Sequence, residues 1–236
     1  YEILRCLVGS EMCIRDSQKG MKEIIQELKN FLKPKDIGTD SDRALLLDFQ
    51  ATLEIKPEKA IKLEKDALAQ IENITADNAR LVSNLHANLG GLYRMNGHPD
   101  LAREHMEKSI SLLDQFNLLH INDSIPQIAN YAMFLTEQQE PERGISELQK
   151  LSGIIKEYHS DDCLDYAKVQ ETLGTIYLMT ANLPQAKTHF KRAFKIYEKI
   201  WADEPEMIEA KYQEIQELYP QIGFCIGKNL SGLLTK

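Results

Sequence analysis

The sequence predicts an all-α protein, a right-handed α-solenoid of stacked antiparallel helix pairs, and its internal spacing supports this fold class. Four small residues stand 42 residues apart, at Ala60, Ala102, Gly144 and Ala186. Each follows a turn-like stretch and opens an apolar run with helical spacing, whereas no segment alternates with the period of a strand. Because a repeat of two helices cannot bury its own apolar faces, neighbouring repeats must stack into a continuous core.

Further columns of residues stand in register with these small residues. In the second and fourth repeats a bulky residue and a glycine precede a tyrosine, as Leu89, Gly90 and Tyr93 and as Leu173, Gly174 and Tyr177. The first repeat departs from this pattern, because Asp48 and Glu64 stand where a small residue and an apolar residue belong. The third repeat carries Leu151 in place of a small residue.

These columns resemble the tetratricopeptide repeat, whose first helix carries Leu-Gly-x-x-Tyr and whose second helix carries Ala, a large apolar residue and Ala. Phe190 and Ala193 match the second helix fully, whereas Met106 and Ser109 match it loosely. The period exceeds the family's usual length of about 34 residues and is similar to that of kinesin light chains and many bacterial repeat proteins. The resemblance covers residues 41–202 and implies a scaffold that binds protein.

The helix pairs are expected in the following order. Residues 18–34 form the second helix of a truncated repeat, which ends at Pro34. Four repeats follow, at 41–76, 77–121, 122–160 and 161–202. Residues 203–236 cap the array with one helix from Asp203 to about Leu218 and a weaker one from Ile222 to Leu234. Residues 18–236 are thus predicted to form a single array.

Prolines and polar residues mark the predicted helix starts. Proline is favoured in the first turn of a helix, where no backbone donor is lost. All four second helices are therefore expected to start at prolines, namely Pro57, Pro99, Pro141 and Pro184. Side chains that accept bonds from unpaired amides favour the starts of first helices. The candidates are Ser41, Asp77, Asp123 or Ser124, and Asp161 or Asp162.

Residues 1–17 are expected to be foreign to the protein. The stretch from Cys6 to Ser17 resembles a translated sequencing adapter, which is typical of a metagenomic fragment. A signal peptide is the competing interpretation, but Gly9 interrupts an apolar run far shorter than the roughly 7–15 residues that a signal core requires. The native start is therefore expected to be missing, and removal of residues 1–17 is expected to leave stability unchanged.

The composition argues against nucleic-acid binding and favours a reducing cellular compartment. The chain has 28 basic and 36 acidic residues and lacks the clustered Lys and Arg that nucleic-acid binding requires. Outside residues 1–17 only Cys163 and Cys225 remain, which favours a reduced, cytoplasmic setting, with any signal or anchor lost upstream. No stretch approaches the roughly 18 apolar residues of a membrane span. The oligomeric state stays open.

The sequence contains no constellation that indicates catalysis, a metal or a cofactor. His98 and His105 lie two turns apart, but a metal site needs three or four convergent ligands at a recognised spacing. Cys163 has no His at the spacing of a catalytic pair. Surface positions are the favoured interpretation of all six histidines. We therefore expect no catalytic residue, no metal and no cofactor, and predict that the chain is not an enzyme.

One pair of residues suggests a binding site. Asn88 and Asn130 stand 42 residues apart on first helices, which line the concave groove in the family that the chain resembles. In kinesin light chain-type repeats, asparagines at this place bond the backbone of an extended peptide, and an amide offers both the donor and the acceptor that this requires. The alternative is that the pair only bonds between helices. Helical spacing places further residues on the same groove, namely Asn84, Arg94, Met133, Lys168 and Thr175.

Two functions compete at this stage. The first is a scaffold or adaptor that binds a peptide or partner segment in the groove. The second is the C-terminal sensor of a larger bacterial regulator, transcriptional or signalling, whose effector domain is missing upstream. The uncontaminated gene would decide between them, because an upstream effector domain favours the regulator and further repeats alone favour the adaptor.

Overall fold

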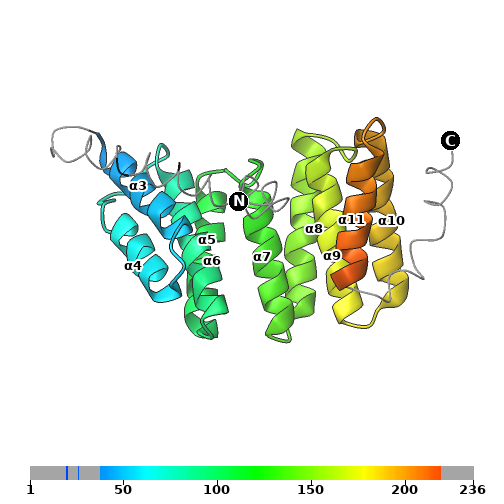
Figure 1. Ribbon diagram of the computed structural model, residues 1–236, viewed down its shortest axis with the longest axis horizontal. Coiled ribbons are helices and arrows are strands. Elements are labelled where there is room, and N and C mark those ends of the chain that lie inside the picture. Colours follow the sequence, from blue (N-terminus) through cyan, green and yellow to red (C-terminus); the bar gives the residue numbers. More distant parts are fainter. Residues whose placement is uncertain (1–19, 21–25, 27–37, 219–236) are drawn as a thin grey trace. The chain divides into compact units, whose positions relative to one another are not determined.

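The computed structural model describes Gly20, Gln26 and residues 38–218, and it divides the chain into two compact units that meet in sequence between Phe116 and Asn117 (Figure 1). Across residues 38–218 the structure contains nine α-helices and no strand, which confirms the all-α prediction. Residues 1–17, the helix predicted at 18–34 apart from Gly20 and Gln26, and the helix predicted at 222–234 lie outside the described residues.

The first unit contains two antiparallel helix pairs (Figure 1). The first pair is α3 (Asp40–Thr52) with α4 (Pro57–Leu68), and the second is α5 (Ala79–Met95) with α6 (Pro99–Gln115). Because α4 packs against α5, the two pairs share a core in which Ala44, Ala67 and Leu85 are fully buried. This arrangement is the predicted stacking of helix pairs, and it buries the small columns at Ala60 and Ala102.

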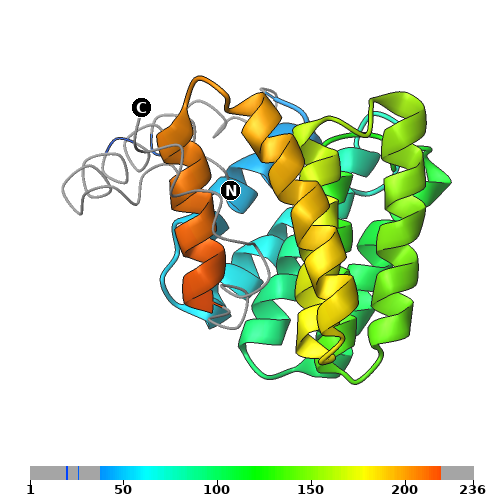
Figure 2. The ribbon, with the colours of Figure 1, turned by 90° about the vertical axis from the view of Figure 1, so that its right-hand side faces the viewer.

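The second unit contains two further pairs and one additional helix (Figures 1 and 2). The pairs are α7 (Ser124–Glu137) with α8 (Pro141–Tyr158), and α9 (Leu164–Met179) with α10 (Leu183–Ile200). The first helices α7 and α9 contact each other, and α8 packs against α9. The last described helix, α11 (Pro205–Leu218), packs against α10. Helix pairs thus stack in this unit as in the first.

Each second helix carries its predicted proline in the first turn. Pro57, Pro99 and Pro141 are the first residues of α4, α6 and α8, and Pro184 is the second residue of α10. The four second helices therefore share one start, as the sequence predicts.

Several predicted starts of first helices are wrong. α3 is capped by Thr39 instead of Ser41, because the Thr39 hydroxyl accepts a bond from the Asp42 amide and the Asp42 carboxylate accepts one from the Thr39 amide. Asn78 stands at the start of α5 instead of Asp77. Cys163 caps α9 instead of Asp161 or Asp162, since its sulfur accepts a bond from the Tyr166 amide.

The two remaining predictions for first helices give the approximate start of the helix but not its capping residue. Asp123 does precede α7, but its side chain makes no capping bond, and the Ser124 hydroxyl donates to two loop carbonyls instead of accepting. Similarly, α11 begins at Pro205, two residues after the predicted capping residue Asp203. A polar side chain near a helix start thus locates the loop without identifying the capping residue.

The turns between the two helices of a repeat recur with the 42-residue period. Gly97, Gln139 and Ala181 all have a positive φ, of 74°, 65° and 57°. The residue after each of them donates its amide proton to a carbonyl five residues earlier, with N···O distances of 2.7–2.9 Å. This bond closes the C-terminal turn of α5, α7 and α9 and satisfies a carbonyl that the helix leaves unpaired.

Small residues of the first helices meet large residues of the second. A Cβ atom on Gly90 would lie 2.5 Å from Cγ of Met106, and one on Gly174 would lie 2.9 Å from the ring of Phe190. At Gly144, on the second helix α8, the contact is with backbone, because a Cβ there would lie 2.6 Å from the carbonyl oxygen of Ala132. The size of these side chains therefore sets the distance between paired helices.

Candidate functional site

The predicted groove residues lie on the first helices of three repeats. Asn84, Asn88 and Arg94 are on α5 of the first unit, and each is half-buried. In the second unit, Asn130 and Met133 are on α7, and Lys168 and Thr175 are on α9. Since α7 contacts α9, the structure brings the last four residues onto neighbouring helices. Asn130 is exposed, whereas Met133, Lys168 and Thr175 are half-buried.

Asn88 is bonded within its own unit. Its Nδ2 donates to Oδ1 of Asp48 on α3 at 2.8 Å and to Oε1 of Glu64 on α4 at 3.3 Å. These contacts agree with the alternative interpretation that the asparagine bonds between helices, although the acceptors are carboxylates. Ligand binding by Asn88 stays a prediction.

Asp48 and Glu64 form an acidic pair, in which Glu64 is buried and Asp48 is half-buried. Glu64 is only 2% exposed, and one of its oxygens, Oε2, has no hydrogen-bond partner among the described residues. Burial, followed by the charge of Asp48, raises the pKa of Glu64 to about 9. Burial also raises the pKa of Asp48. The pair therefore retains a proton at neutral pH, because two neighbouring carboxylates cannot both ionise cheaply in a buried site.

This acidic pair explains why the first repeat departs from the sequence pattern. Asp48 stands at the position of Gly90 and Gly174, and Glu64 stands at the position of Met106 and Phe190, with which those glycines pack. The two exceptions in the sequence are therefore partners in the structure. In the first repeat, hydrogen bonds from Asn88 to both carboxylates join α3, α4 and α5. In the second and fourth repeats, a glycine packs against a large side chain at the same positions.

A second polar cluster lies between α5 and α6. Nδ1 of His86 lies 2.9 Å from Nδ1 of His105, and the ring of Tyr93 stacks on His105 with centroids 5.4 Å apart. Burial, followed by the charges of His105 and Lys108, lowers the pKa of His86 to about 4. Burial also lowers the pKa of His105. Both imidazoles are thus neutral at pH 7, and one donates to the other.

The same cluster recurs two periods later, between α9 and α10. Nδ1 of His189 lies 2.9 Å from Oε1 of Gln170, and Tyr177 stacks on His189 with centroids 5.2 Å apart. Burial, followed by the charge of Arg192, lowers the pKa of His189. Because His189 is only 9% exposed, the prediction that all histidines are surface residues is wrong for this one.

A chain of polar contacts joins the last three described helices. The Tyr197 hydroxyl on α10 donates to Oε2 of Glu171 on α9 at 2.6 Å, and Nζ of Lys211 on α11 lies 2.9 Å from Oε1 of the same carboxylate. Burial, followed by the Glu171 charge, raises the pKa of Tyr197, so the hydroxyl stays protonated and can donate. These contacts hold Glu171 in place next to Thr172 and one turn from Lys168 and Thr175.

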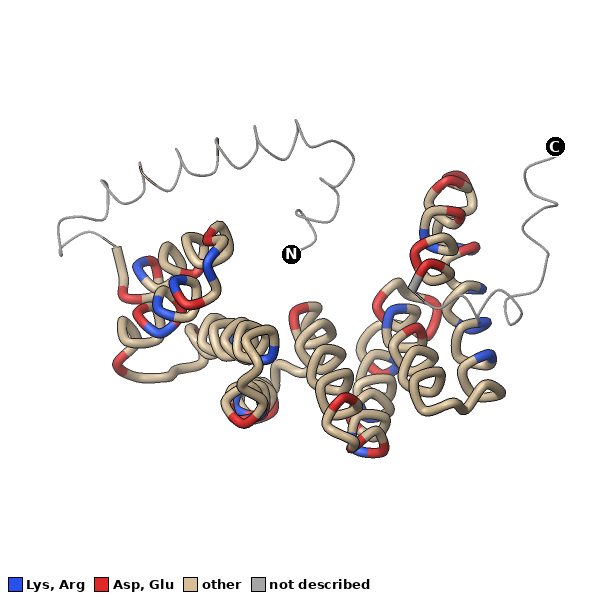
Figure 3. Tube along the Cα trace, turned by 60° about the horizontal axis from the view of Figure 1, so that its bottom comes forward, with Lys and Arg blue, Asp and Glu red and all other residues tan. Residues whose placement is uncertain are grey.

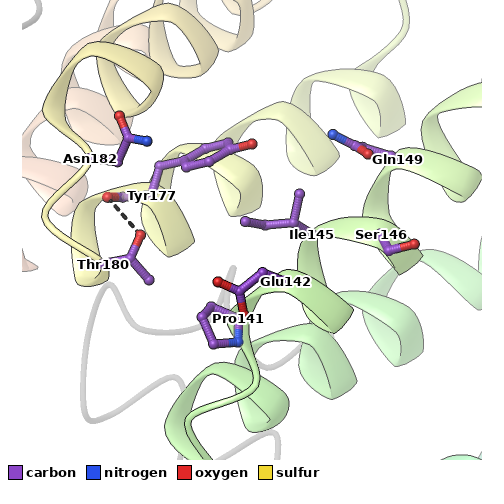
Figure 4. A pocket seen from close by; sticks show the side chains of 8 residues that line it. All are labelled: Pro141, Glu142, Ile145, Ser146, Gln149, Tyr177, Thr180 and Asn182. Carbon is purple, nitrogen blue, oxygen red and sulfur yellow. Dashed lines mark hydrogen bonds between the residues drawn. The ribbon is translucent and has the colours of Figure 1, made fainter.

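An open pocket of about 450 Å³ lies between α8 and the junction of α9 with α10 (Figure 4). We call it the Tyr177 pocket. Tyr177 and Ile145 project into it and supply apolar surface, while the other lining residues are mostly polar. They are Pro141, Glu142, Ser146, Gln149, Thr180 and Asn182. Tyr177 lies nine residues from Lys168, so the pocket and the predicted groove residues of α9 face opposite sides of that helix.

Other chemistry has little support in the described part of the chain. Within residues 38–218 no group of three His, Cys, Asp or Glu side chains converges as a metal site would require. Acidic and basic residues occur in both units, with basic residues most frequent on α10 and acidic ones on α11 (Figure 3). None of the described helices is both long and apolar enough to cross a membrane.

Stacked helix pairs with a periodic small residue define the class: an α-helical repeat protein, whose fold generally serves as a protein-interaction scaffold. Residues 124–199 match the model of the tetratricopeptide repeat family. The resemblance inferred from the sequence is thereby confirmed over the third and fourth repeats. No curated protein sequence matches the chain.

Solved structures share the fold at low sequence identity. BtubC (BKLC) from P. vanneervenii is similar with a TM-score of 0.70 and 18% identity, over 93% of this chain and 91% of that one. A putative kinesin light chain with tetratricopeptide-like repeats from Podosopora anserina has a TM-score of 0.62 and 14% identity, over 79% and 92%. MamA has a TM-score of 0.53 and 15% identity, over 80% and 96%.

Sequence reasoning missed the acidic pair, the paired polar clusters and the Tyr177 pocket. A signal for the clusters exists in the sequence, because His105 and His189 stand two periods apart, as do Tyr93 and Tyr177. Comparing repeats two and four directly would have separated these histidines from the others.

Proposed function

We propose that this chain is a binding module that holds a peptide or partner segment in the concave groove lined by its first helices. The observation that carries the proposal is the exposed carboxamide of Asn130 on α7, with Lys168 and Thr175 on the adjacent helix α9. An exposed amide can donate to and accept from a peptide backbone at once. The half-buried thioether of Met133, one turn along α7, adds an adaptable apolar contact.

Within this proposal, Asn130 and Asn88 differ in what binding requires of them. Asn130 is accessible as it stands. Asn88 already donates to Asp48 and Glu64, so a peptide would have to use its remaining oxygen or displace one of these bonds. We therefore expect Asn130 to contribute more to peptide binding than Asn88.

The test is calorimetry with a peptide selected against the intact chain from a random library. Asn130→Ala should weaken binding by about 1 kcal/mol, the usual net value of one hydrogen bond, with an unchanged thermal melt. Asn88→Ala should weaken it less and should also lower stability, because it leaves the acidic pair without its donor. Asn122→Ala removes an exposed amide from the loop before α7 and serves as the control. Equal affinity of the Asn130→Ala variant and the parent would contradict the proposal.

A further inference from the structure

The Tyr177 pocket has a counterpart in the first unit, two periods earlier in the sequence. Four of its eight lining residues recur there unchanged: Pro141, Glu142, Ile145 and Tyr177 correspond to Pro57, Glu58, Ile61 and Tyr93. The same side chains are thus carried by equivalent helices, α8 and α9 in the second unit and α4 and α5 in the first. The remaining four positions differ, and at two of them the first unit carries a lysine: Lys62 and Lys65 stand where Ser146 and Gln149 do.

In the first unit a lysine of the chain itself occupies this place. Nζ of Lys65 lies over the ring of Tyr93, 5.6 Å from its centroid, which is within the range of a cation–π contact. His98 packs edge-on against the same ring, with centroids 6.1 Å apart. Tyr93 is consequently buried, with 5% exposure.

In the second unit the equivalents of these two covering residues are short and uncharged. Gln149 stands where Lys65 does, and Asn182 stands where His98 does. Both are exposed, and Tyr177 is only half-buried. The second unit therefore has the tyrosine and the residues around it, but no described lysine lies over the ring. A pocket is open at that place instead.

We propose that the Tyr177 pocket binds a lysine side chain of a partner protein, whose ammonium group takes the place over Tyr177 that Lys65 holds over Tyr93. Ile145 and Pro141 offer apolar surface to the four-carbon stem. The carboxylate of Glu142 and the side-chain oxygen of Gln149 can accept ammonium protons, and Oδ1 of Asn182 keeps a second lone pair beside the bond that it accepts from the Gln185 amide at 3.4 Å. Glu142 makes no ion pair with any described residue, so its charge is available to a ligand.

This site is distinct from the proposed groove, because Tyr177 and the groove residues lie on opposite sides of α9. Its failure and the failure of the proposed function are therefore separable. Stacking of His189 on Tyr177 holds the ring at a fixed angle, as stacking of His105 does for Tyr93. The aromatic surface is thus in place before a ligand arrives, which lowers the ordering cost of binding.

The test is an NMR titration of the intact chain with two capped tripeptides, acetyl-Gly-Lys-Gly-amide and its norleucine analogue. The two share the four-carbon stem, and only the first carries a charge. We expect saturable shifts at Ile145 and Tyr177 with the lysine peptide and affinity about fivefold weaker for the norleucine peptide, the value of one partly desolvated cation–π contact. Equal affinity of the two peptides, or no saturable shift with either, overturns the proposal.

Two exchange variants supply the matched control. Gln149→Lys should fill the pocket from within and abolish the shifts caused by the lysine peptide. Lys65→Gln should open the equivalent place over Tyr93 and create lysine-peptide shifts in the first unit. Both positions are exposed, so both variants should keep the parent's circular dichroism spectrum. Undiminished lysine-peptide binding by Gln149→Lys would place the ligand elsewhere and overturn the proposal.

Discussion

At the residue scale, the acidic pair makes the stability of the first unit depend on pH. Because the pKa of Glu64 is raised from 4.5 to about 9, the folded chain holds a proton between these values that the unfolded chain has released. Its stabilising contribution is complete below pH 4.5 and is lost as the pH rises towards 9. His86 acts in the opposite direction, since its pKa is lowered from 6.5 to about 4 and its contribution is lost on acidification through that window.

Glu64→Gln should remove the alkaline part of this dependence. The amide keeps the shape of the side chain and cannot ionise, so the free energy of unfolding should stay level between pH 7 and 9 in the variant. In the parent it should fall with a limiting slope of about 1.4 kcal/mol per pH unit. Urea denaturation followed by circular dichroism at several pH values measures both. The range above pH 7 avoids the titration of His86, and identical slopes in variant and parent would disprove the shared proton.

At the scale of helix pairs, contact distance depends on the small residues, and α8 offers a matched pair of glycines. Gly144→Ala should destabilise the second unit by about 1–3 kcal/mol, because the new methyl group would press on the Ala132 carbonyl. Gly153→Ala in the same helix meets nothing within 4 Å and should stabilise by about 0.5–1 kcal/mol through helix propensity. Thermal melts of the two variants measure the difference, and a shift of the same sign in both would refute the close approach.

The first helix pair can be converted into the type found in the third repeat, where Ala132 and Leu148 hold the positions of Asp48 and Glu64. Asp48→Ala combined with Glu64→Leu should raise the free energy of unfolding by about 1–4 kcal/mol, as seen when buried ionisable partners give way to packed apolar ones. Each single variant should be less stable than the double, because it leaves one buried carboxyl without its partner. A double-mutant cycle measures this coupling, and additive effects would show that the two residues act independently.

At the same scale, the limits of sequence reasoning have physical causes. The helix pairs, the prolines at the starts of second helices and the buried small residues were predictable. Packing and proline geometry require the same type of residue at the same position of each repeat, so these residues recur with the 42-residue period. The turn at Gly97, Gln139 and Ala181 was not, because the backbone imposes a positive φ on residues that share no side-chain chemistry. Cys163 caps α9 in place of the expected aspartates, because its sulfur lies where it can accept a hydrogen bond from the Tyr166 amide.

The candidate sites divide in the same way. The period identified Asn88 and Asn130 as equivalent positions, but it could not reveal that Asp48 and Glu64 lie within hydrogen-bond distance of the first and not the second. That difference depends on two residues 40 and 24 positions away in the sequence. Likewise, the Tyr177 pocket is open because Gln149 and Asn182 stand where the first unit has Lys65 and His98. Neither residue is unusual in itself, so the sequence gives no signal for the pocket.

At the scale of the whole molecule, the negative net charge should strengthen the binding of a positively charged partner. The chain carries a formal charge of −8, which attracts cations over distances set by the ionic strength. Raising the salt concentration shortens the screening length from about 10 Å at 0.1 M to about 3 Å at 1 M. Affinity for the lysine tripeptide should therefore fall with added NaCl, whereas affinity for the norleucine peptide should not.

Glu142→Gln separates the local charge from the field of the whole chain. If Glu142 alone attracts the ammonium group, the variant should bind the lysine peptide with no dependence on salt. We expect a weaker dependence to remain, because the other acidic residues still contribute to the field around the pocket. NMR titrations at several NaCl concentrations compare the slopes of variant and parent. A variant slope of zero would assign the attraction to the pocket, and equal slopes would show that Glu142 does not face the bound lysine.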